Sequence, residues 1–405
     1  MSASGPGDSA SPLIVVAPDK FKGSLSAAEA AGALARGLRR RLPGGRIVEH
    51  PIADGGEGTV EMVLHHGFLA VSLTVHGPTG APVAATYALR GETAVVEMAA
   101  AAGLDLLPGG APDDSSARTA STYGVGELIR DALDRGARRI VLAVGGSATT
   151  DGGAGMVAAL GGRLRTASGP VPPEGGAGLL TVERLDLDGL DARLAEATVV
   201  VASDVDNPLT GPSGAAAVYG PQKGATPPTV ELLDRALGHW ADVVAAATGS
   251  DLRERPGAGA AGGLAFGAAA LLGADIRSGI EYLLELSGFA GTVAGADLVL
   301  VGEGSLDEQS LRGKGPVGVA ALAAGAGARV VAVAGRSSVA ARRLRALGID
   351  AVHTLAELEP DERRSMAHAA ELLEATAERI AADWLLDEQQ RGRPREGTRP
   401  RERGD

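Results

Sequence analysis

The chain has 405 residues, and 45% of them are apolar, which is enough to fill the cores of two or three domains. Its net charge of −12 and its aromatic fraction of 2% argue against nucleic-acid binding, because a basic surface and base-stacking rings are both missing. The absence of Cys excludes disulfides and thiol chemistry, and the seven His show no spacing typical of a metal site.

Both ends of the chain read as tails. Residues 1–12 are rich in Ser, Gly, Pro and Ala and have neither the basic nor the apolar part of a signal peptide. Residues 387–405 contain no apolar side chain, so we expect them to be disordered, like residues 1–12. The uncharged run 256–274 is mostly Gly and Ala and is a poor candidate for a membrane span. We therefore expect a cytoplasmic protein without a membrane partner.

The first part of the chain predicts units of strand, polar loop and helix. An apolar strand over 13–17 leads through PDKFKGSLS into a helix over 27–41, with Ser26 as its N-cap and Glu29 as the capping-box partner. A second strand over 47–50 leads through PIADGGEGT into a helix over 60–66. From 69 to 98 apolar and polar residues alternate, which predicts antiparallel hairpins and the start of a second domain.

The next part predicts an anion cradle. A helix over 119–134 and a strand over 139–144 precede GGSATTDGGAG, and another helix follows to about residue 160. Glycine-freed N–H groups and hydroxyls beside a helix N-terminus suit an anion. The candidates are Gly145, Gly146, Ser147, Thr149, Asp151 and Gly152. The alternative is a tight packing turn between strand and helix. Residues 161–195 read as loop-rich.

A further predicted strand, 199–202, delivers two carboxylates at its carboxyl end. Asp204 and Asp206, with Ser203 and Asn207, suit a Mg²⁺ site or a general base. The alternative is an Asx turn with helix capping. Helices are predicted next, over 230–247, 263–272 and 280–286.

The stretch 297–315 carries the densest group of polar side chains. Its apolar run, 298–301, predicts a buried parallel strand that ends at Gly302, and Glu303 and Asp307 then follow in a loop before Gly-Lys-Gly. Carboxylates at the end of such a strand favour a metal–phosphate site, and the alternative is an ordinary solvated loop. The remaining predicted elements are a helix over 317–324, a strand over 330–334, a helix over 339–347, a strand over 351–353 and a helix over 363–386.

The use of lysine is selective. Of 38 basic side chains only four are Lys, and each lies in a short glycine-bearing loop: Lys20, Lys22, Lys223 and Lys314. An ammonium is a compact point charge that suits phosphate oxygens, whereas Arg is a planar fork. The pattern favours a phosphate-handling role for these lysines, and the alternative is chance.

Seven motifs, in this order, resemble the bacterial type I glycerate kinase family. They are APDKFKGSLSAAEAA, ADGGEGT, GGSATTDGGAGM, DVDNPLTG, GPQKGA, GAGAAGG and GEGSLDEQS with GKGP. The resemblance covers about residues 13–340. Thr150 departs from it, because the family usually has Asn there; Thr keeps a hydroxyl but lacks the amide.

The resemblance implies two α/β domains around an active-site cleft. A discontinuous Rossmann-like parallel-sheet domain would comprise 13–68 and 287–386, and an inserted mixed α/β domain would comprise 69–286. The implied reaction is ATP- and Mg²⁺-dependent phosphorylation of D-glycerate, with 2-phosphoglycerate as the usual product of this family.

With this reaction in mind, roles can be assigned to the candidate residues. Asp204, Asp206, Lys20, Lys22 and Lys314 are the candidates for catalysis. Gly145, Gly146, Ser147, Thr149, Asp151, Gly152 and Lys223 are the candidates for nucleotide binding, and Asp204, Glu303 and Asp307 are the candidates for the metal.

Other functions remain open. They are a nucleotide-binding regulatory module without turnover and a kinase of another small hydroxy acid. A dinucleotide oxidoreductase is disfavoured, because the first turn reads PDKFKGS in place of G-x-G-x-x-G. The assembly is expected to be a monomer or a homodimer.

Overall fold

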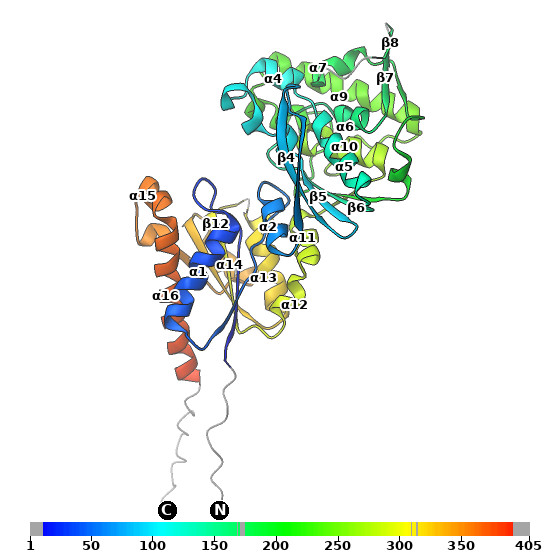
Figure 1. Ribbon diagram of the computed structural model, residues 1–405. Coiled ribbons are helices and arrows are strands. Elements are labelled where there is room, and N and C mark those ends of the chain that lie inside the picture. Colours follow the sequence, from blue (N-terminus) through cyan, green and yellow to red (C-terminus); the bar gives the residue numbers. More distant parts are fainter. Residues whose placement is uncertain (1–10, 168, 171–174, 309, 313–314, 392–405) are drawn as a thin grey trace, which may run out of the picture. The chain divides into compact units, whose positions relative to one another are not determined.

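The computed structural model describes residues 11–167, 169–170, 175–308, 310–312 and 315–391, which fold into two compact units (Figure 1). Unit 1 takes in Met1–His50, Thr292–Glu308 and Ala320–Asp405, and unit 2 takes in Pro51–Gly291 and Gln309–Val319. Two helices, α12 (Phe289–Val293) and α13 (Gly315–Gly325), each contain one of the boundaries. Among the described residues no helix has both the length and the apolar character that a bilayer span requires.

Unit 1 is built on a five-stranded parallel sheet in the order β14-β13-β12-β1-β2. Its strands are β1 (Leu13–Pro18), β2 (Arg46–Glu49), β12 (Leu298–Leu306), β13 (Arg329–Ser337) and β14 (Ala351–Thr354). The predicted end of β12 at Gly302 is wrong, because the strand continues to Leu306 beside β13. Glu303 pairs with Ala334 and Ser305 with Arg336, so the backbone ladder holds these polar residues in the strand.

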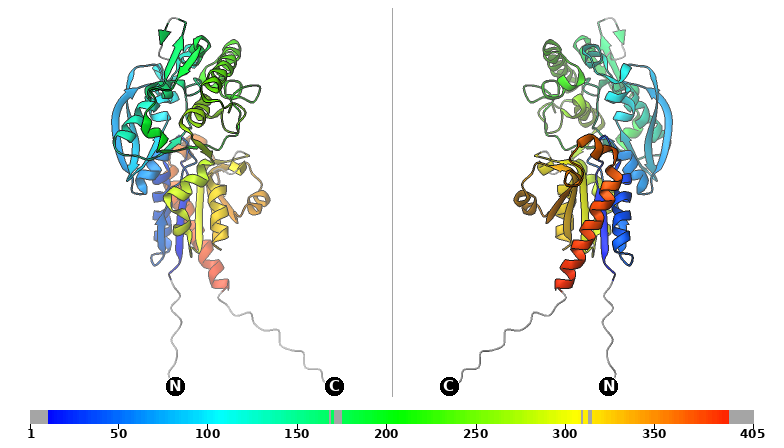
Figure 2. Two further views of the ribbon diagram at one scale, coloured as in Figure 1. Left: turned by 90° about the vertical axis from the view of Figure 1, so that its right-hand side faces the viewer. Right: turned by 90° about the vertical axis from the view of Figure 1, so that its left-hand side faces the viewer.

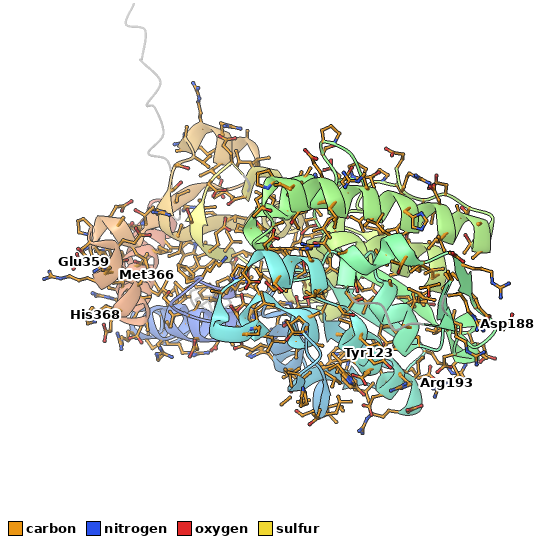
Figure 3. The ribbon with its side chains drawn as sticks, turned by 90° about the horizontal axis from the view of Figure 1, so that it is seen from above. Tyr123, Asp188, Arg193, Glu359, Met366 and His368 are labelled. Atoms are coloured by element: carbon orange, nitrogen blue, oxygen red, sulfur yellow. The ribbon has the colours of Figure 1, made fainter. Side chains whose placement is uncertain are left out.

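Helices α1 (Ala27–Arg41) and α16 (Ala369–Arg391) pack against each other in unit 1 (Figure 2). The predicted capping box of α1 is confirmed, since Ser26 and Glu29 bond reciprocally. The helix predicted over 363–386 is two helices, α15 (Glu362–Ala367) and α16, and Figure 3 shows Met366 and His368 at their junction.

The C-terminal tail was predicted to begin too early. Residues 387–391 continue α16, because their side chains are mostly good helix formers. The rest of the two predicted tails, 1–10 and 392–405, lies outside the described residues. Helix α14 (Ala341–Ala346) and the short turn η7 (Leu355–Glu357) complete unit 1.

Unit 2 is built on a six-stranded mixed sheet in the order β11-β10-β6-β5-β4-β3. The predicted hairpins are confirmed as β3 (Leu69–His76), β4 (Pro82–Arg90) and β5 (Thr93–Glu97), which pair antiparallel. Strands β6 (Arg139–Ala143), β10 (Thr198–Ala202) and β11 (Asp275–Arg277) extend the sheet in parallel. The carboxyl ends of β6 and β10 are therefore neighbours.

Helices cover both faces of this sheet. The larger core includes side chains from α5 (Tyr123–Asp134), α6 (Ala154–Ala159), α9 (Pro227–Thr248) and α10 (Ala260–Leu272). The smaller core joins α2 (Thr59–His65) and α11 (Gly279–Ser287) to the other face.

The packing of the smaller core places one domain boundary at a different position from the one that we expected. Residues 51–68, expected in the first domain, belong to unit 2, because Met62, Val63 and Phe68 pack with Val95 and Val141 of its sheet. The second boundary falls after Gly291, whereas we expected it after residue 286.

Short elements fill the connections of unit 2. The region 161–195, expected to be loop-rich, contains a small antiparallel sheet of β7 (Arg163–Thr166), β8 (Gly169–Pro170) and β9 (Arg184–Asp186). The remaining elements of unit 2 are α3 (Ala99–Ala102), η1 (Leu104–Leu106), η2 (Pro108–Gly110), α4 (Asp114–Thr119), α7 (Gly175–Gly178), η3 (Leu179–Thr181), η4 (Ala192–Ala195), α8 (Ala215–Tyr219), η5 (Pro221–Lys223) and η6 (Ser310–Arg312).

Candidate active site

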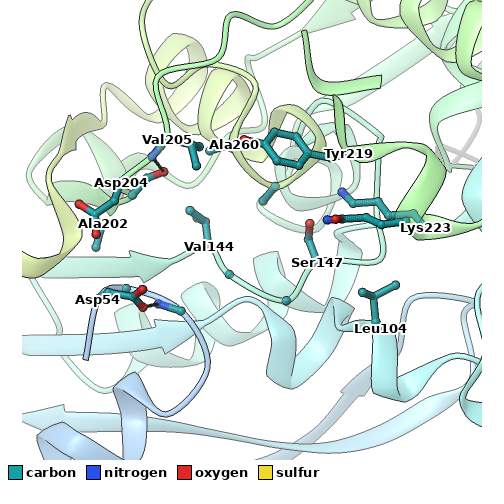
Figure 4. A pocket seen from close by; sticks show the side chains of 17 residues that line it. Asp54, Leu104, Val144, Ser147, Ala202, Asp204, Val205, Tyr219, Lys223 and Ala260 are labelled. Atoms are coloured by element: carbon teal, nitrogen blue, oxygen red, sulfur yellow. Dashed lines mark hydrogen bonds between the residues drawn. The ribbon is translucent and has the colours of Figure 1, made fainter. Parts of the chain in front are cut away.

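A pocket in unit 2 lies at the carboxyl ends of the neighbouring parallel strands β6 and β10, where ligands bind in open α/β sheets. Figure 4 shows its carboxylates, Asp54 and Asp204, on one side, with Ser147, Tyr219 and Lys223 on the other. Its lining comprises Asp54, Gly55, Gly56, Leu104, Val144, Gly145, Gly146, Ser147, Ala202, Ser203, Asp204, Val205, Tyr219, Gln222, Lys223, Ala260 and Ala261.

The turn after β6 divides the residues predicted to bind an anion. Gly145, Gly146 and Ser147 line the pocket, whereas Thr149 and Asp151 are fully buried and are not part of its lining. Gly152, also predicted, is buried in the same turn. A Cβ at Gly145 would lie 2.5 Å from the Cα of Gly56, so only glycine lets the two loops approach this closely.

Both carboxylate oxygens of Asp151 accept hydrogen bonds from neighbouring residues of the protein. Its Oδ2 accepts hydrogen bonds from the backbone N and Oγ1 of Thr122, both at 2.8 Å, and from the N of Gly155 at 3.2 Å. Its Oδ1 accepts from the N of Gly153 at 3.2 Å. Burial raises the pKa of this carboxyl, and the four hydrogen bonds oppose the shift. Asp151 thus ties the start of α6 to the start of α5.

Lys223 enters the pocket wall from η5 and is 2% exposed. Its Nζ donates a hydrogen bond of 2.6 Å to the backbone oxygen of Thr149. Burial lowers the pKa of Lys223 to about 7, and the negative charge of Asp151 acts in the opposite direction. Figure 4 shows the side chain reaching toward the turn that carries Ser147.

Asp204, directly after β10, keeps one oxygen without a protein partner. Its Oδ1 accepts hydrogen bonds from Ser278 Oγ at 3.0 Å and from Gly279 N at 2.9 Å, at the start of α11. Its Oδ2 is buried and has no hydrogen-bond partner among the described residues. Burial raises the pKa of Asp204, and the charge of Asp54 adds to the rise. These bonds are made to the start of α11, so they agree with the helix-capping part of the alternative and not with an Asx turn.

Asp206 and Tyr219 differ from what the sequence suggested. Asp206 is exposed and is not part of the pocket lining, although it was a catalytic candidate. Tyr219 does line the pocket, and its hydroxyl donates a 2.6 Å hydrogen bond to Asn207 Oδ1. The pKa of Tyr219 is raised by burial and then by the charge of Asp206. No sequence signal singled out Tyr219, whereas Asp54 stood in a motif and received no role.

Four other candidates belong to unit 1, at the carboxyl end of its parallel sheet. Lys20 and Lys22 follow β1, Glu303 lies in β12, and Asp307 follows β12. The two strand ends are adjacent, since Asp19 N donates to Gly302 O at 2.8 Å. Lys314 lies outside the described residues. Within the part of the chain that is described, no three His, Asp or Glu side chains gather as a metal-binding group.

Comparison with known proteins identifies the family. The model of the Glycerate kinase family matches residues 14–385. The chain belongs to the glycerate kinase family. It is 46% identical to the glycerate kinase of Bacillus subtilis, over 92% of this chain and 98% of that one. It is 43% identical to the glycerate 2-kinase of Escherichia coli, over 84% and 90%.

A solved structure agrees with this assignment. The crystal structure of a protein from Salmonella typhimurium LT2, provisionally named glycerate kinase 2, superposes with a TM-score of 0.82. It is 43% identical in sequence, and the match covers 94% of this chain and all of that one. Membership of the glycerate kinase family confirms the resemblance and the expectation of a kinase with an α/β fold.

Proposed function

We propose that this protein transfers the γ-phosphoryl group of ATP to the 2-hydroxyl of D-glycerate, giving 2-phosphoglycerate and ADP. Family membership supports glycerate as the acceptor. The observation that carries the proposal is a single pocket with a carboxylate end, Asp54 and Asp204, and a cationic end, Lys223. Phosphoryl transfer needs positioning and charge neutralisation more than covalent chemistry, and such a pocket offers groups for both.

Asp204 is the proposed proton acceptor. Hydrogen bonds from Ser278 and Gly279 hold Oδ1, and they thereby also fix the position of Oδ2. A buried carboxylate oxygen without a partner is costly unless a ligand proton or cation satisfies it. The raised pKa makes Asp204 a stronger base for the proton of the 2-hydroxyl. As this proton is transferred, the 2-hydroxyl oxygen attacks the γ-phosphorus. The bond from the γ-phosphorus to the bridging oxygen then breaks, and ADP leaves.

The opposite end of the pocket is proposed to hold anionic oxygens. Gly145, Gly146 and Ser147 offer backbone N–H groups and a hydroxyl, and Lys223 offers an ammonium. The phosphate-handling roles predicted for Lys20, Lys22 and Lys314 remain proposals, and so does the catalytic role predicted for the carboxylate of Asp206.

The carboxylates also fit a magnesium ion. Mg²⁺ in kinases is held by one or two carboxylates together with substrate phosphates and water. Asp54, whose Oδ1 accepts from Gly56 N at 3.1 Å, would be the ligand in the pocket of unit 2. The metal-binding roles predicted for Glu303 and Asp307 of unit 1 are a separate proposal. We assign Asp204 to the proton because its free oxygen is desolvated. When bound, the ion would neutralise charge on the phosphates.

The activity test combines turnover with product identification. The full chain is incubated with ATP, MgCl₂ and D-glycerate, ADP is followed by a coupled assay, and the phosphorylated product is identified by ³¹P NMR. We expect glycerate-dependent ADP formation and 2-phosphoglycerate. L-Glycerate and other small hydroxy acids serve as controls for the acceptor, and chelation followed by readdition of Mg²⁺ tests the metal.

Each arm of this test has its own contrary result. The absence of glycerate-dependent ADP would overturn the reaction, whereas 3-phosphoglycerate as product would overturn the choice of hydroxyl alone. Full turnover after chelation would remove the metal from the proposal. A faster reaction with another hydroxy acid would replace the acceptor.

A further inference from the structure

The amine of Lys223 has no counter-ion in hydrogen-bond contact among the described residues. Its Nζ has one hydrogen-bond partner among the described residues, the neutral backbone oxygen of Thr149. The side chain is buried, so water screens it little. A charged amine in such a place costs free energy unless an anion joins it, and the neutral amine is therefore favoured while the pocket is empty of anions.

The ionisable groups around η5 do not supply that anion. Helices α4 and α8 pack against η5, and Gly224 packs against the backbone of Asp113. Asp113 caps α4 through Ser116, Asp114 accepts from Thr226, and Tyr219 donates to Asn207. Arg118 on α4 is exposed and positive.

The nearest acidic charge is Asp151, and its two oxygens already accept four hydrogen bonds. Asp54 and Asp204 line the same pocket, but their carboxylates accept hydrogen bonds from Gly56 and from Ser278 and Gly279 respectively. In the described part of the chain, Asp151 thus acts on Lys223 only through its charge, because its oxygens already accept hydrogen bonds from other residues.

We infer that Lys223 takes up a proton from solvent when an anionic group, either a phosphate or a carboxylate, enters this pocket. The nitrogen lone pair forms the new N–H bond, and the ammonium then donates to the anion as well as to Thr149. The inference rests on the proposed function for the identity of the ligands, D-glycerate and ATP. Its geometric basis is the burial of the amine, its single neutral acceptor, and its place in the wall shared with Gly145–Ser147.

This inference fixes the direction of a pH effect. The pKa of Lys223, lowered to about 7 by burial, leaves the amine mostly neutral at pH 8 and mostly charged at pH 6. An anion favours the charged form and raises that pKa. Binding should therefore draw in up to one proton at pH 8 and much less at pH 6, where the amine is already mostly charged. The dissociation constant should rise with pH above pH 7 by at most about tenfold per pH unit, because this group takes up no more than one proton.

The small number of lysines makes a direct test possible. The full chain contains four, so labelling with [ε-¹³C]lysine yields at most four ε-carbon signals from lysine. We expect one signal to titrate near pH 7 in the free protein. Adding saturating D-glycerate, or a non-hydrolysable ATP analogue with Mg²⁺, at pH 8 should move that signal to its protonated position. Lys223→Met assigns it, and Lys20→Met, Lys22→Met and Lys314→Met assign it by elimination if the first variant does not fold.

Tyr219→Phe is the matched control, because it alters the same pocket and keeps the ammonium. We expect its Lys223 signal to shift on ligand binding as in the natural chain, whereas Lys223→Met should bind with an affinity that is flat between pH 6 and 8 once the titration of the ligand is subtracted. A Lys223 signal already protonated at pH 8 without ligand, or still neutral with both ligands bound, would overturn the inference. A failure of either ligand to bind would instead count against the proposed function.

Discussion

Two adjacent loops in unit 2 use a buried carboxylate in opposite ways. The turn after β6 carries Asp151, and the loop after β10 carries Asp204, at the ends of paired parallel strands. Asp151 accepts four hydrogen bonds from the protein, whereas Asp204 directs one oxygen to α11 and leaves the other without a partner among the described residues. A saturated buried carboxylate holds the fold together, and an unsatisfied one is available to a ligand.

Local chain geometry explains this difference. Asp151 lies two residues before Gly153, the N-cap of α6, where the first N–H groups of the helix need acceptors, and its oxygens accept from Gly153 and Gly155. After β10 the chain runs on through an extended loop, and Asp204 meets the start of α11. A Cβ at Gly279 would lie 2.1 Å from the backbone oxygen of Asp54 and 3.3 Å from Asp204 Oδ2, so glycine at that position lets α11 approach both loops closely.

The largest effect on activity is expected at Asp204. In Asp204→Asn the amide oxygen can still accept from Ser278 and Gly279, so the fold should persist, but the proton acceptor is lost. We expect kcat to fall on the order of 10² to 10⁴-fold, with a melting temperature close to that of the natural chain. Steady-state kinetics and a thermal melt measure the two quantities on one sample.

Asp188→Asn provides the control, because Asp188 is an exposed carboxylate of unit 2, in the turn after β9 (Figure 3). It should leave kcat unchanged. If Asp204→Asn also turned over at the natural rate, the unpartnered oxygen would be a packing detail, and the contrast between the two loops would lose its functional meaning.

The largest effect on stability is expected at Asp151. Asp151→Ala leaves several buried donors without an acceptor, so the free energy of unfolding should fall by about 3 to 5 kcal/mol. Urea denaturation measures this loss, with Asp188→Ala as the exposed comparison. A loss no greater than that of Asp188→Ala would show that water replaces the carboxylate, and the turn after β6 would then be a wetter place than its burial indicates.

Local signals in the sequence predicted most of the elements. The Ser26–Glu29 capping box, the alternation over 69–98 and the apolar strands each need only neighbouring residues to be recognised. The predictions failed where contacts with residues far along the chain determine the extent of an element or the unit to which it belongs. β12 runs past Gly302 because β13 pairs with it, and residues 51–68 join unit 2 because Phe68 and its neighbours meet strands of that sheet.

The candidate site shows the same limit. The motifs identified Asp151 and Asp204 equally, since both follow an apolar strand in a polar loop. They differ in their hydrogen-bond partners, because Thr122 donates to Asp151 and Ser278 donates to Asp204. The spacing of residues in the sequence does not reveal those contacts. Tyr219 was missed for the same reason, because only the fold brings α8 to the ends of β6 and β10.

The smallest expected effect compares two buried threonine hydroxyls at the turn after β6, one with hydrogen-bond partners and one without. Thr122 and Thr150 are equally buried, but their hydroxyls differ. Thr122 Oγ1 donates to Asp151 and accepts from Met156 N at 2.9 Å, whereas Thr150 Oγ1 has no hydrogen-bond partner among the described residues. Replacing Thr with Val keeps the shape and removes the hydroxyl. Thr150→Val should therefore raise the free energy of unfolding by about 1 kcal/mol, because a desolvated group without a partner is removed.

Thr122→Val is the matched variant and should act in the opposite direction, lowering the free energy of unfolding by about 1 to 3 kcal/mol, since it leaves the N–H of Met156 without its acceptor. For a unit of this size each kcal/mol corresponds to roughly 2–4 °C in melting temperature, so the pair should separate clearly in a thermal melt. Losses of similar size in both variants would mean that an ordered water satisfies Thr150, and the turn would then hold a solvent molecule where its burial indicates a dry contact.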